Sequence, residues 1–75
     1  MEFDDFIEKL ALLFEDTDTT GFNGETKFKE YEEYSSLMAL NIMAMVDEEY
    51  DIKIKPEDIR NSFTIDELYK TVISK

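Results

Sequence analysis

The chain has 75 residues, with nineteen acidic and eight basic side chains, a net charge of −11, and no cysteine or histidine. This composition excludes disulfides, thiolate or imidazole metal sites and the usual histidine general base. The negative charge repels phosphate backbones and anionic headgroups, so we expect basic protein surfaces as partners, and neither nucleic acid nor membranes. A chain of this size forms one domain, residues 1–75, with no room for a deep catalytic cleft. We therefore do not expect an enzyme.

The acidic residues are concentrated toward the N-terminus. Residues 1–51 hold fifteen acidic and three basic side chains, whereas residues 52–75 hold four and five. The chain is 43% apolar, which is enough for a folded core despite the charge. Its acidic start lacks the features of a signal peptide, and no apolar run reaches the length of a membrane span. We expect a cytoplasmic protein that is a monomer.

Residues 2–15 are predicted to form an amphipathic helix, because apolar residues recur at three- and four-residue steps. Residues 16–35 contain both glycines and many turn formers, which indicates a long connection. We expect its aromatic residues to hold this connection against the core: Phe22, Phe28, Tyr31 and Tyr34.

A second helix is predicted from Ser36 to about Tyr50. Pro56, with two acids behind it, suits the first position of a short third helix within residues 55–62. Thr64 and Glu67 have capping-box spacing and begin a last helix that reaches Ser74. No strand pattern is convincing, so the sequence predicts an all-α bundle of three main helices and one short helix, with a long loop between the first and second helices.

The second helix is apolar on more than one side. On a helical wheel, one narrow stripe has the spacing of a core seam: Ala39, Ile42, Met43, Val46 and Tyr50. A bundle this small can hardly cover the other sides, although packing under the loop would account for any single residue. We therefore expect an apolar docking surface with a polar and acidic rim: Leu37, Met38, Leu40, Asn41, Ala44, Asp47 and Glu48. Met43 is assigned to the core, while Met38 and Met45 could lie in either place.

Two serines precede this helix, and one of them is expected to cap it. A hydroxyl at a helix N-terminus also suits a phosphodiester, because the free N–H groups and the helix dipole favour an anion there. On this feature alone, a plain helix cap is the preferred interpretation.

The order of motifs resembles the acyl carrier protein family over essentially the whole chain. Ser35-Ser36-Leu37 stands where the family has Asp-Ser-Leu, and an acidic cluster ending in an aromatic follows at Asp47-Glu48-Glu49-Tyr50. Asp51-Ile52-Lys53-Ile54 is similar to the family's Gly-Ile-x-Ile segment. Pro56-Glu57-Asp58 resembles the start of its short third helix, and Thr64-Ile65-Asp66-Glu67-Leu68 resembles its last helix.

This resemblance implies that Ser36 carries 4′-phosphopantetheine, attached from coenzyme A by a phosphopantetheinyl transferase. The arm would hold acyl groups as thioesters and present them to acyl-transferring or synthase enzymes with basic docking surfaces, in fatty acid, polyketide or related biosynthesis. The chain departs from the family where Ser35 replaces the acidic residue that helps to recruit the transferase. Met38 and Asn41 also occupy positions that are often acidic in the family.

Two other interpretations remain open. The first is a carrier-like acidic protein that is never modified and binds basic partners, which the substitution by Ser35 favours. The second is a calcium site, since Asp16, Asp18, Thr20 and Gly21 match positions 1, 3, 5 and 6 of an EF-hand loop. Lys27 stands at position 12, where a glutamate is required. We therefore favour local turns made by the Asp and Thr side chains and expect no metal.

Overall fold

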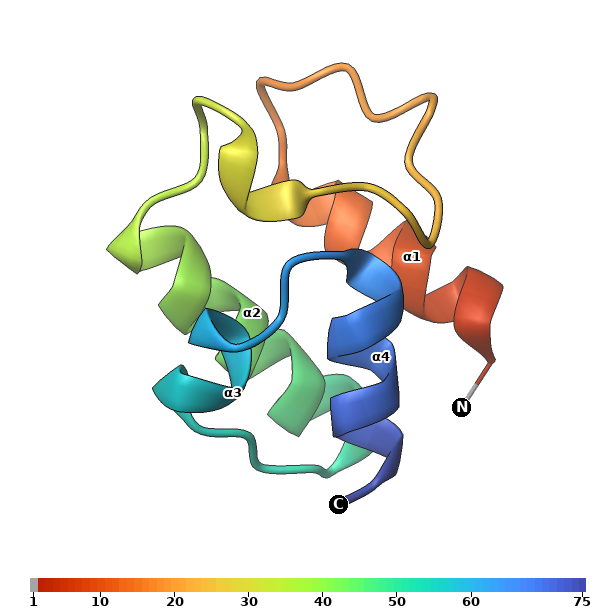
Figure 1. Ribbon diagram of the computed structural model, residues 1–75, viewed down its shortest axis with the longest axis vertical. Helices are drawn as coiled ribbons and strands as arrows, with labels where there is room; N and C mark the ends of the chain where they lie inside the picture. The colour runs from red at the N-terminus through yellow and green to blue at the C-terminus, as the bar shows by residue number, and fades with distance from the viewer. Residues whose placement is uncertain (1) are drawn as a thin grey trace.

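The computed structural model describes residues 2–75 and contains only helices and loops over this range. Its elements in chain order are α1 (Phe3–Leu13), the 3₁₀ helix η1 (Phe28–Glu30), α2 (Ser36–Tyr50), α3 (Pro56–Arg60) and α4 (Ile65–Ile73). Helix α1 packs against α2 and α4, and the short α3 packs against the same two helices (Figure 1). The predicted all-α bundle with one short helix and one long loop is confirmed.

The helix boundaries follow from local capping. Ser35 caps α2, because its hydroxyl accepts a hydrogen bond from the Met38 backbone N–H at 3.3 Å. Helix α4 begins with the predicted capping box: the Thr64 Oγ1 accepts from the Glu67 N–H, and the Glu67 carboxylate accepts from the Thr64 N–H. Pro56 occupies the first turn of α3, as predicted.

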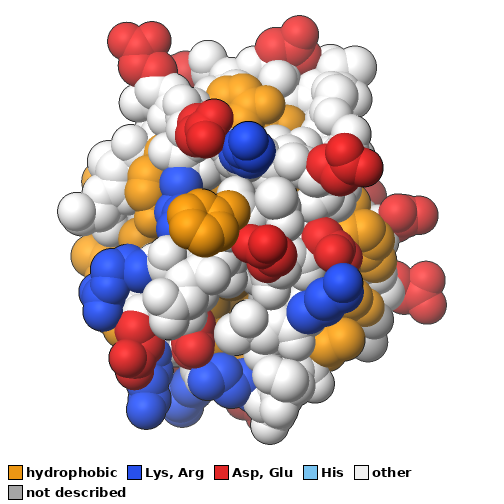
Figure 2. All heavy atoms as spheres, viewed as in Figure 1, with side chains coloured by type: hydrophobic (Ala, Val, Ile, Leu, Met, Phe, Trp, Pro, Cys, Tyr) orange, Lys and Arg blue, Asp and Glu red, His pale blue; other side chains and the backbone are white. Residues whose placement is uncertain are grey.

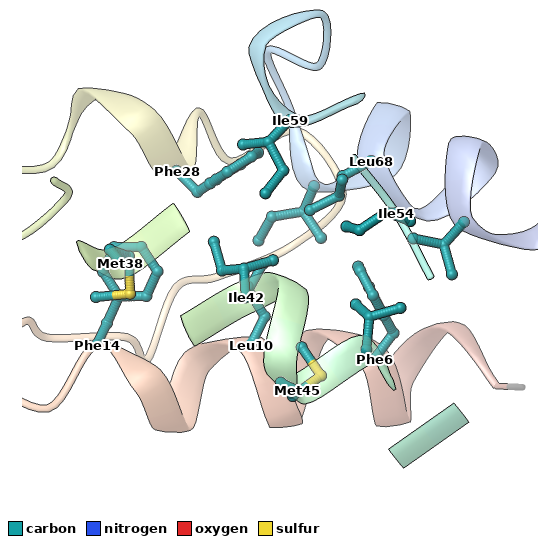
Figure 3. Packing of buried hydrophobic residues seen from close by; sticks show 13 residues of the cluster. Phe6, Leu10, Phe14, Phe28, Met38, Ile42, Met45, Ile54, Ile59 and Leu68 are labelled. Carbon is teal, nitrogen blue, oxygen red and sulfur yellow. The ribbon is translucent and has the colours of Figure 1, made fainter. Parts of the chain in front are cut away.

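The core is built from all four helices and the loop. Its largest fully buried side chains include three phenylalanines: Phe6 lies within α1, Phe14 directly follows α1, and Phe28 belongs to η1. Figure 3 shows how the buried residues of α2 meet these rings and the residues of α3 and α4. Helix α2 supplies Met38, Ile42, Met45 and Val46. Met43, assigned to the core from the sequence, is half-buried and packs against this cluster.

Two methionines of α2 lie in the core. Met38 is only 5% exposed and Met45 only 7%. The expectation that Met38 belongs to an exposed docking surface was therefore wrong. The reason is the position of α1 and of Phe14 directly after it: in Figure 3 Met45 lies close to the α1 ribbon, and Met38 lies beside Phe14.

The long loop is fastened at several points, and in Figure 1 it arches over one end of the bundle. Two backbone hydrogen bonds join it to the start of α4, from the Ile65 N–H to the Thr26 carbonyl at 3.0 Å and from the Asp66 N–H to the Gly24 carbonyl at 2.9 Å. The Lys29 ammonium donates to the carbonyls of Ile59 and Arg60 at the end of α3. These contacts confirm that the loop is held to the core rather than solvated along its length.

The loop aromatics pack in pairs. Phe22 and Tyr31 both meet the ring of Phe14, and Tyr34 meets the buried ring of Phe28. Ring centroids 5.5 to 6.1 Å apart, in edge-on arrangements, are favourable for aromatic pairs. The predicted role of these aromatic residues is confirmed, and it fixes the chain just before α2.

Charge is balanced on the face that carries α3 and α4. Figure 2 shows lysine and arginine side chains interspersed with acidic ones there. Ion pairs join Lys70 to Asp66 at 3.0 Å and Lys75 to Asp58 at 3.1 Å. The excess negative charge of the chain therefore belongs to the remaining surfaces, formed by α1, the loop and α2.

Candidate functional site

The two serines at the start of α2 have different environments. Ser35 is the residue before the helix, with extended backbone angles, and its hydroxyl is engaged in the cap. Ser36 is the first helical residue and is exposed. Within residues 2–75 no hydrogen bond to another residue engages the Ser36 hydroxyl, so it is accessible from solvent.

An apolar hollow adjoins Ser36 between α2 and α3. It has a volume of about 350 Å³ and is lined by Tyr34, Ser36, Ala39, Leu40, Met43, Pro56, Ile59 and Arg60. The only charged group in this lining is the Arg60 guanidinium. The hollow therefore offers apolar walls and one cation beside an accessible hydroxyl.

The sequence did not identify the α3 side of this hollow. Pro56, Ile59 and Arg60 were assigned only to a short helix, and their spacing of three and one residues is compatible with one face of a helix turn. The connection through residues 51–55 decides which helix this face of α3 packs against. The local sequence does not predict the direction of that connection.

The residues expected to form one docking surface lie on two different sides of α2. Leu37 and Leu40 are 66% and 56% exposed, and Asn41, Ala44 and Glu48 are exposed as well. Leu40 lines the hollow next to Ser36, whereas Leu37 lies on the side of α2 that faces α1. Residues four and seven apart share a face of a helix. The exposed part of α2 therefore presents one leucine beside each neighbouring helix, Leu37 beside α1 and Leu40 beside α3.

Acidic groups are absent from the beginning of α2 and present at its end. The first turn of α2 holds no acidic residue. At the other end, Asp47 is half-buried and pairs with the Lys53 ammonium at 3.2 Å. Sequence analysis did not predict this pair, because Lys53 follows the helix and only the left-handed turn at Asp51 brings it back. The rim is thus less negative at Asp47 than the sequence suggests.

Two of the residues that match EF-hand positions are joined by local hydrogen bonds. Asp18 accepts hydrogen bonds from the backbone N–H and the hydroxyl of Thr20, at 3.1 and 2.6 Å. These bonds hold the pKa of the Asp18 carboxyl below its usual value. The predicted local turn is therefore confirmed at Asp18 and Thr20. In the described part of the chain, no three acidic side chains gather closely enough to hold a metal ion.

Comparisons with protein-family models, with curated proteins and with solved structures found nothing that matches this chain. Among residues 2–75, none of the helices is both long and apolar enough to cross a bilayer. Functional assignment therefore depends on the site itself and on the resemblance of its motifs.

Proposed function

We propose that the protein is an acyl carrier whose Ser36 holds a 4′-phosphopantetheine arm. The observation that carries this proposal is the exposed Ser36 hydroxyl at the first position of α2, directly before Leu37 and beside an apolar hollow. The order of motifs along the chain supports it. We further propose that the protein has no catalytic activity of its own and that it works in the cytoplasm, where coenzyme A would supply the arm.

The surroundings of Ser36 suit a phosphodiester. The first N–H groups of a helix lack partners within the helix, and the helix dipole is positive there. The Ser35 cap satisfies the Met38 N–H and leaves the N–H groups of Ser36 and Leu37 for an anion. Arg60, in the lining of the same hollow, adds a nearby positive charge. When bound, the arm would supply the thiol that the sequence lacks.

The hollow next to Ser36 suits an apolar cargo. Its walls include Leu40, Met43 and Ile59, and the flexible, unbranched Met43 side chain can adjust to chains of different length. The wall on the α3 side belongs to a helix of only five residues. A helix of this length has fewer backbone hydrogen bonds than a long one, so we propose that the hollow widens on this side.

Partner enzymes would dock on the exposed part of α2. Leu37 and Leu40 provide apolar contacts near Ser36, with Asn41 and Ala44 alongside, while Asp47 and Glu48 provide negative charge one to two turns further on. Such partners would include a phosphopantetheinyl transferase and acyl-transferring or synthase enzymes with basic surfaces. Exposed charges at a rim mainly raise the rate of encounter.

The test is modification of purified protein by a broad-specificity phosphopantetheinyl transferase with coenzyme A and Mg²⁺, followed by intact-mass measurement. We expect wild type to gain the mass of one phosphopantetheine, and Ser36→Ala to gain none. Ser35→Asp restores an acidic residue before Ser36, so it should be modified faster than wild type. An unchanged mass for both wild type and Ser35→Asp would refute the carrier assignment.

A second candidate is a carrier-like acidic protein that is never modified and acts only by binding basic partners. The observation in its favour is the first turn of α2, which has no acid to attract a transferase. Intact mass of protein purified from its native host separates the two candidates, because a carrier should contain a heavier fraction and an unmodified binding protein should not.

A further inference from the structure

We propose that the docking surface of α2 in the proposed function continues across the seam onto α1 as a groove, and that this groove binds a basic amphipathic helix of another protein whether or not Ser36 is modified. Two shallow hollows lie along this seam. The first is lined by Lys9, Leu12, Leu13, Asn41, Ala44, Met45, Glu48 and Glu49, and has a volume of about 490 Å³. The second, of about 300 Å³, is lined by Leu13, Glu15, Glu33, Ser35, Leu37, Met38 and Asn41.

The two hollows form one groove, because they share Leu13 and Asn41. Helices α1 and α2 run antiparallel here, since Asp5 near the start of α1 bonds to Tyr50 at the end of α2, while Leu13 at the end of α1 lies beside Leu37 at the start of α2. From Leu37 to Glu48 the groove follows α2 for about 17 Å at 1.5 Å per residue, which is about three helical turns.

The floor of the groove is apolar and partly exposed. Leu12 is 70% exposed, more than any other large apolar side chain of the described residues. It stands on α1 opposite exposed Ala44, and Leu37 extends the apolar surface toward the start of α2. Packing within the domain explains the burial of Met38 and Met45 beneath the groove, but it does not explain an exposed leucine above them. Exposed apolar groups with charged borders are typical of interaction surfaces.

The side chains along the border of the groove are mostly acidic, which favours a basic partner. Four glutamates line it, namely Glu15, Glu33, Glu48 and Glu49, against the single lysine Lys9. Lys9 is already paired with Asp5 and Glu49, at 3.1 and 3.4 Å. A second copy of this chain would bring the same four glutamates against the first set, in a protein of net charge −11. A basic partner meets no such repulsion.

The spacing of the lining residues along α2 favours a helix as the partner. On α2 the lining recurs at Leu37, Asn41, Ala44 and Glu48, which are three or four residues apart and form a straight stripe. Helices also offer no free backbone edge to which an extended segment could add as a strand. A helix with an apolar stripe and flanking lysines or arginines therefore fits this groove, with its apolar side chains between Leu12 and Leu37.

The test uses a fluorescein-labelled synthetic peptide of leucine and lysine, about four helical turns long, with leucines at i, i+3, i+4 and i+7. A scrambled peptide of the same composition has no apolar face and measures attraction by charge alone. Binding is measured by fluorescence anisotropy to the Ser36→Ala protein, which cannot carry an arm. Failure of this binding therefore leaves the carrier assignment untouched, and failure of modification leaves this site untouched.

The decisive variant is Leu12→Asp, with Ile73→Asp on α4 as its matched control. Both replace an exposed apolar side chain by a carboxylate, so both add the same attraction for a basic peptide. We expect Leu12→Asp to weaken binding of the amphipathic peptide about fivefold or more despite its added charge, and Ile73→Asp to change it less than about twofold.

Nuclear magnetic resonance of the wild-type protein gives a second readout that needs no variant. Addition of the peptide should shift backbone amide signals of α1 and of the α1 side of α2 more than those around Leu40 and Arg60. Three results would each overturn the proposal. The scrambled peptide could bind as tightly as the amphipathic one, or Leu12→Asp could bind the amphipathic peptide as tightly as wild type does. The third is that the largest amide shifts lie around the hollow beside Ser36.

Discussion

Ser35 and Ser36 are adjacent residues of the same type, and the structure gives them separable consequences for stability. The Ser35 hydroxyl satisfies a backbone N–H at the start of α2, and the Ser36 hydroxyl is exposed. Ser35→Ala should therefore lower the free energy of unfolding by about 0.5–1 kcal/mol, the lower part of the usual range for an N-cap, because the hydrogen bond is long. Ser36→Ala should leave it nearly unchanged.

Urea unfolding of the two alanine variants, followed by circular dichroism, checks this difference. Ser35→Asp serves as the control, since an aspartate can accept the same hydrogen bond and is favoured by the helix dipole. Its stability should equal or exceed that of wild type. If Ser36→Ala proves to be the destabilised variant, then Ser36 and not Ser35 caps the helix.

Asp51 ends α2 in a conformation that suits glycine. Its φ and ψ are 56° and 40°, which is the left-handed region, and its N–H bonds to the Asp47 carbonyl at 2.9 Å. A side chain in this region is disfavoured, and a carboxylate at a helix C-terminus also meets the negative end of the dipole. Asp51→Gly should therefore raise the free energy of unfolding by up to about 1 kcal/mol.

Asp51→Asn separates the two causes. Asparagine removes the charge and tolerates the left-handed conformation, so it should recover only part of the gain. Asp51→Ala removes the charge but has a Cβ, and should be less stable than the glycine variant. Thermal unfolding of the four proteins at one pH ranks them, and equal stability of Ala and Gly would show that the turn is not maintained.

At the scale of elements, α1 and α2 are joined by a hydrogen bond between their ends. The Tyr50 hydroxyl donates to the Asp5 carboxylate at 2.7 Å, and Lys9 pairs with the same carboxylate. The Tyr50 hydrogen bond, followed by the Lys9 contacts, lowers the pKa of Asp5 below its usual value. Burial, followed by the hydrogen bond to Asp5 and its negative charge, raises the pKa of Tyr50 above its usual value.

This geometry predicts a pH-dependent effect of Tyr50→Phe. A carboxyl with a lowered pKa stabilises the fold fully above its unfolded pKa of about 3.9, and the contribution disappears as the pH falls through the folded pKa. The urea midpoint of Tyr50→Phe should therefore lie below that of wild type at about pH 6, and the gap should shrink by about half or more near pH 2.5. Tyr34→Phe is the control, because the Tyr34 ring packs on Phe28 and its effect should not change over this range.

Short sequence motifs predicted where the helices begin and end better than they predicted which side of each helix is buried. Ser35, Pro56, Thr64 and Glu67 act on the backbone within a few residues, so capping chemistry read from the sequence is visible in the structure. The burial of Met38 and Met45 depends on where α1 lies, more than twenty residues earlier in the chain. Helix α2 has apolar residues on most of its sides, and periodicity alone could not identify the covered one.

The same limit applies to the candidate site. Ser36 could be selected from its motif, because the order of residues around it is a local property. The hollow beside it depends on the direction in which α3 returns, and the groove between α1 and α2 depends on the packing of two helices. Surfaces shared by two elements require tertiary structure, since each element supplies only half of the lining.

At the scale of the whole molecule, the charge of −11 is divided between a balanced face over α3 and α4 and acidic surfaces elsewhere. Partners that approach α2 therefore meet a field that favours basic surfaces and weakens with salt, over a Debye length of about 10 Å at 0.1 M. Ion pairs at such a rim each contribute about 1 kcal/mol or less, so their main effect is on the rate of association.

Reversal of charge at the end of α2 tests this view for the carrier function. Asp47→Lys combined with Glu48→Lys should slow modification by a basic transferase about tenfold at low salt and reduce the salt dependence of the rate. Glu2→Lys combined with Glu25→Lys makes the same change in net charge at exposed positions outside α2, and should have a much smaller effect. The rates are measured by intact mass over a series of salt concentrations. If the two double variants slow modification equally, the net charge of the chain governs the encounter, and the end of α2 is not the surface that partners recognise.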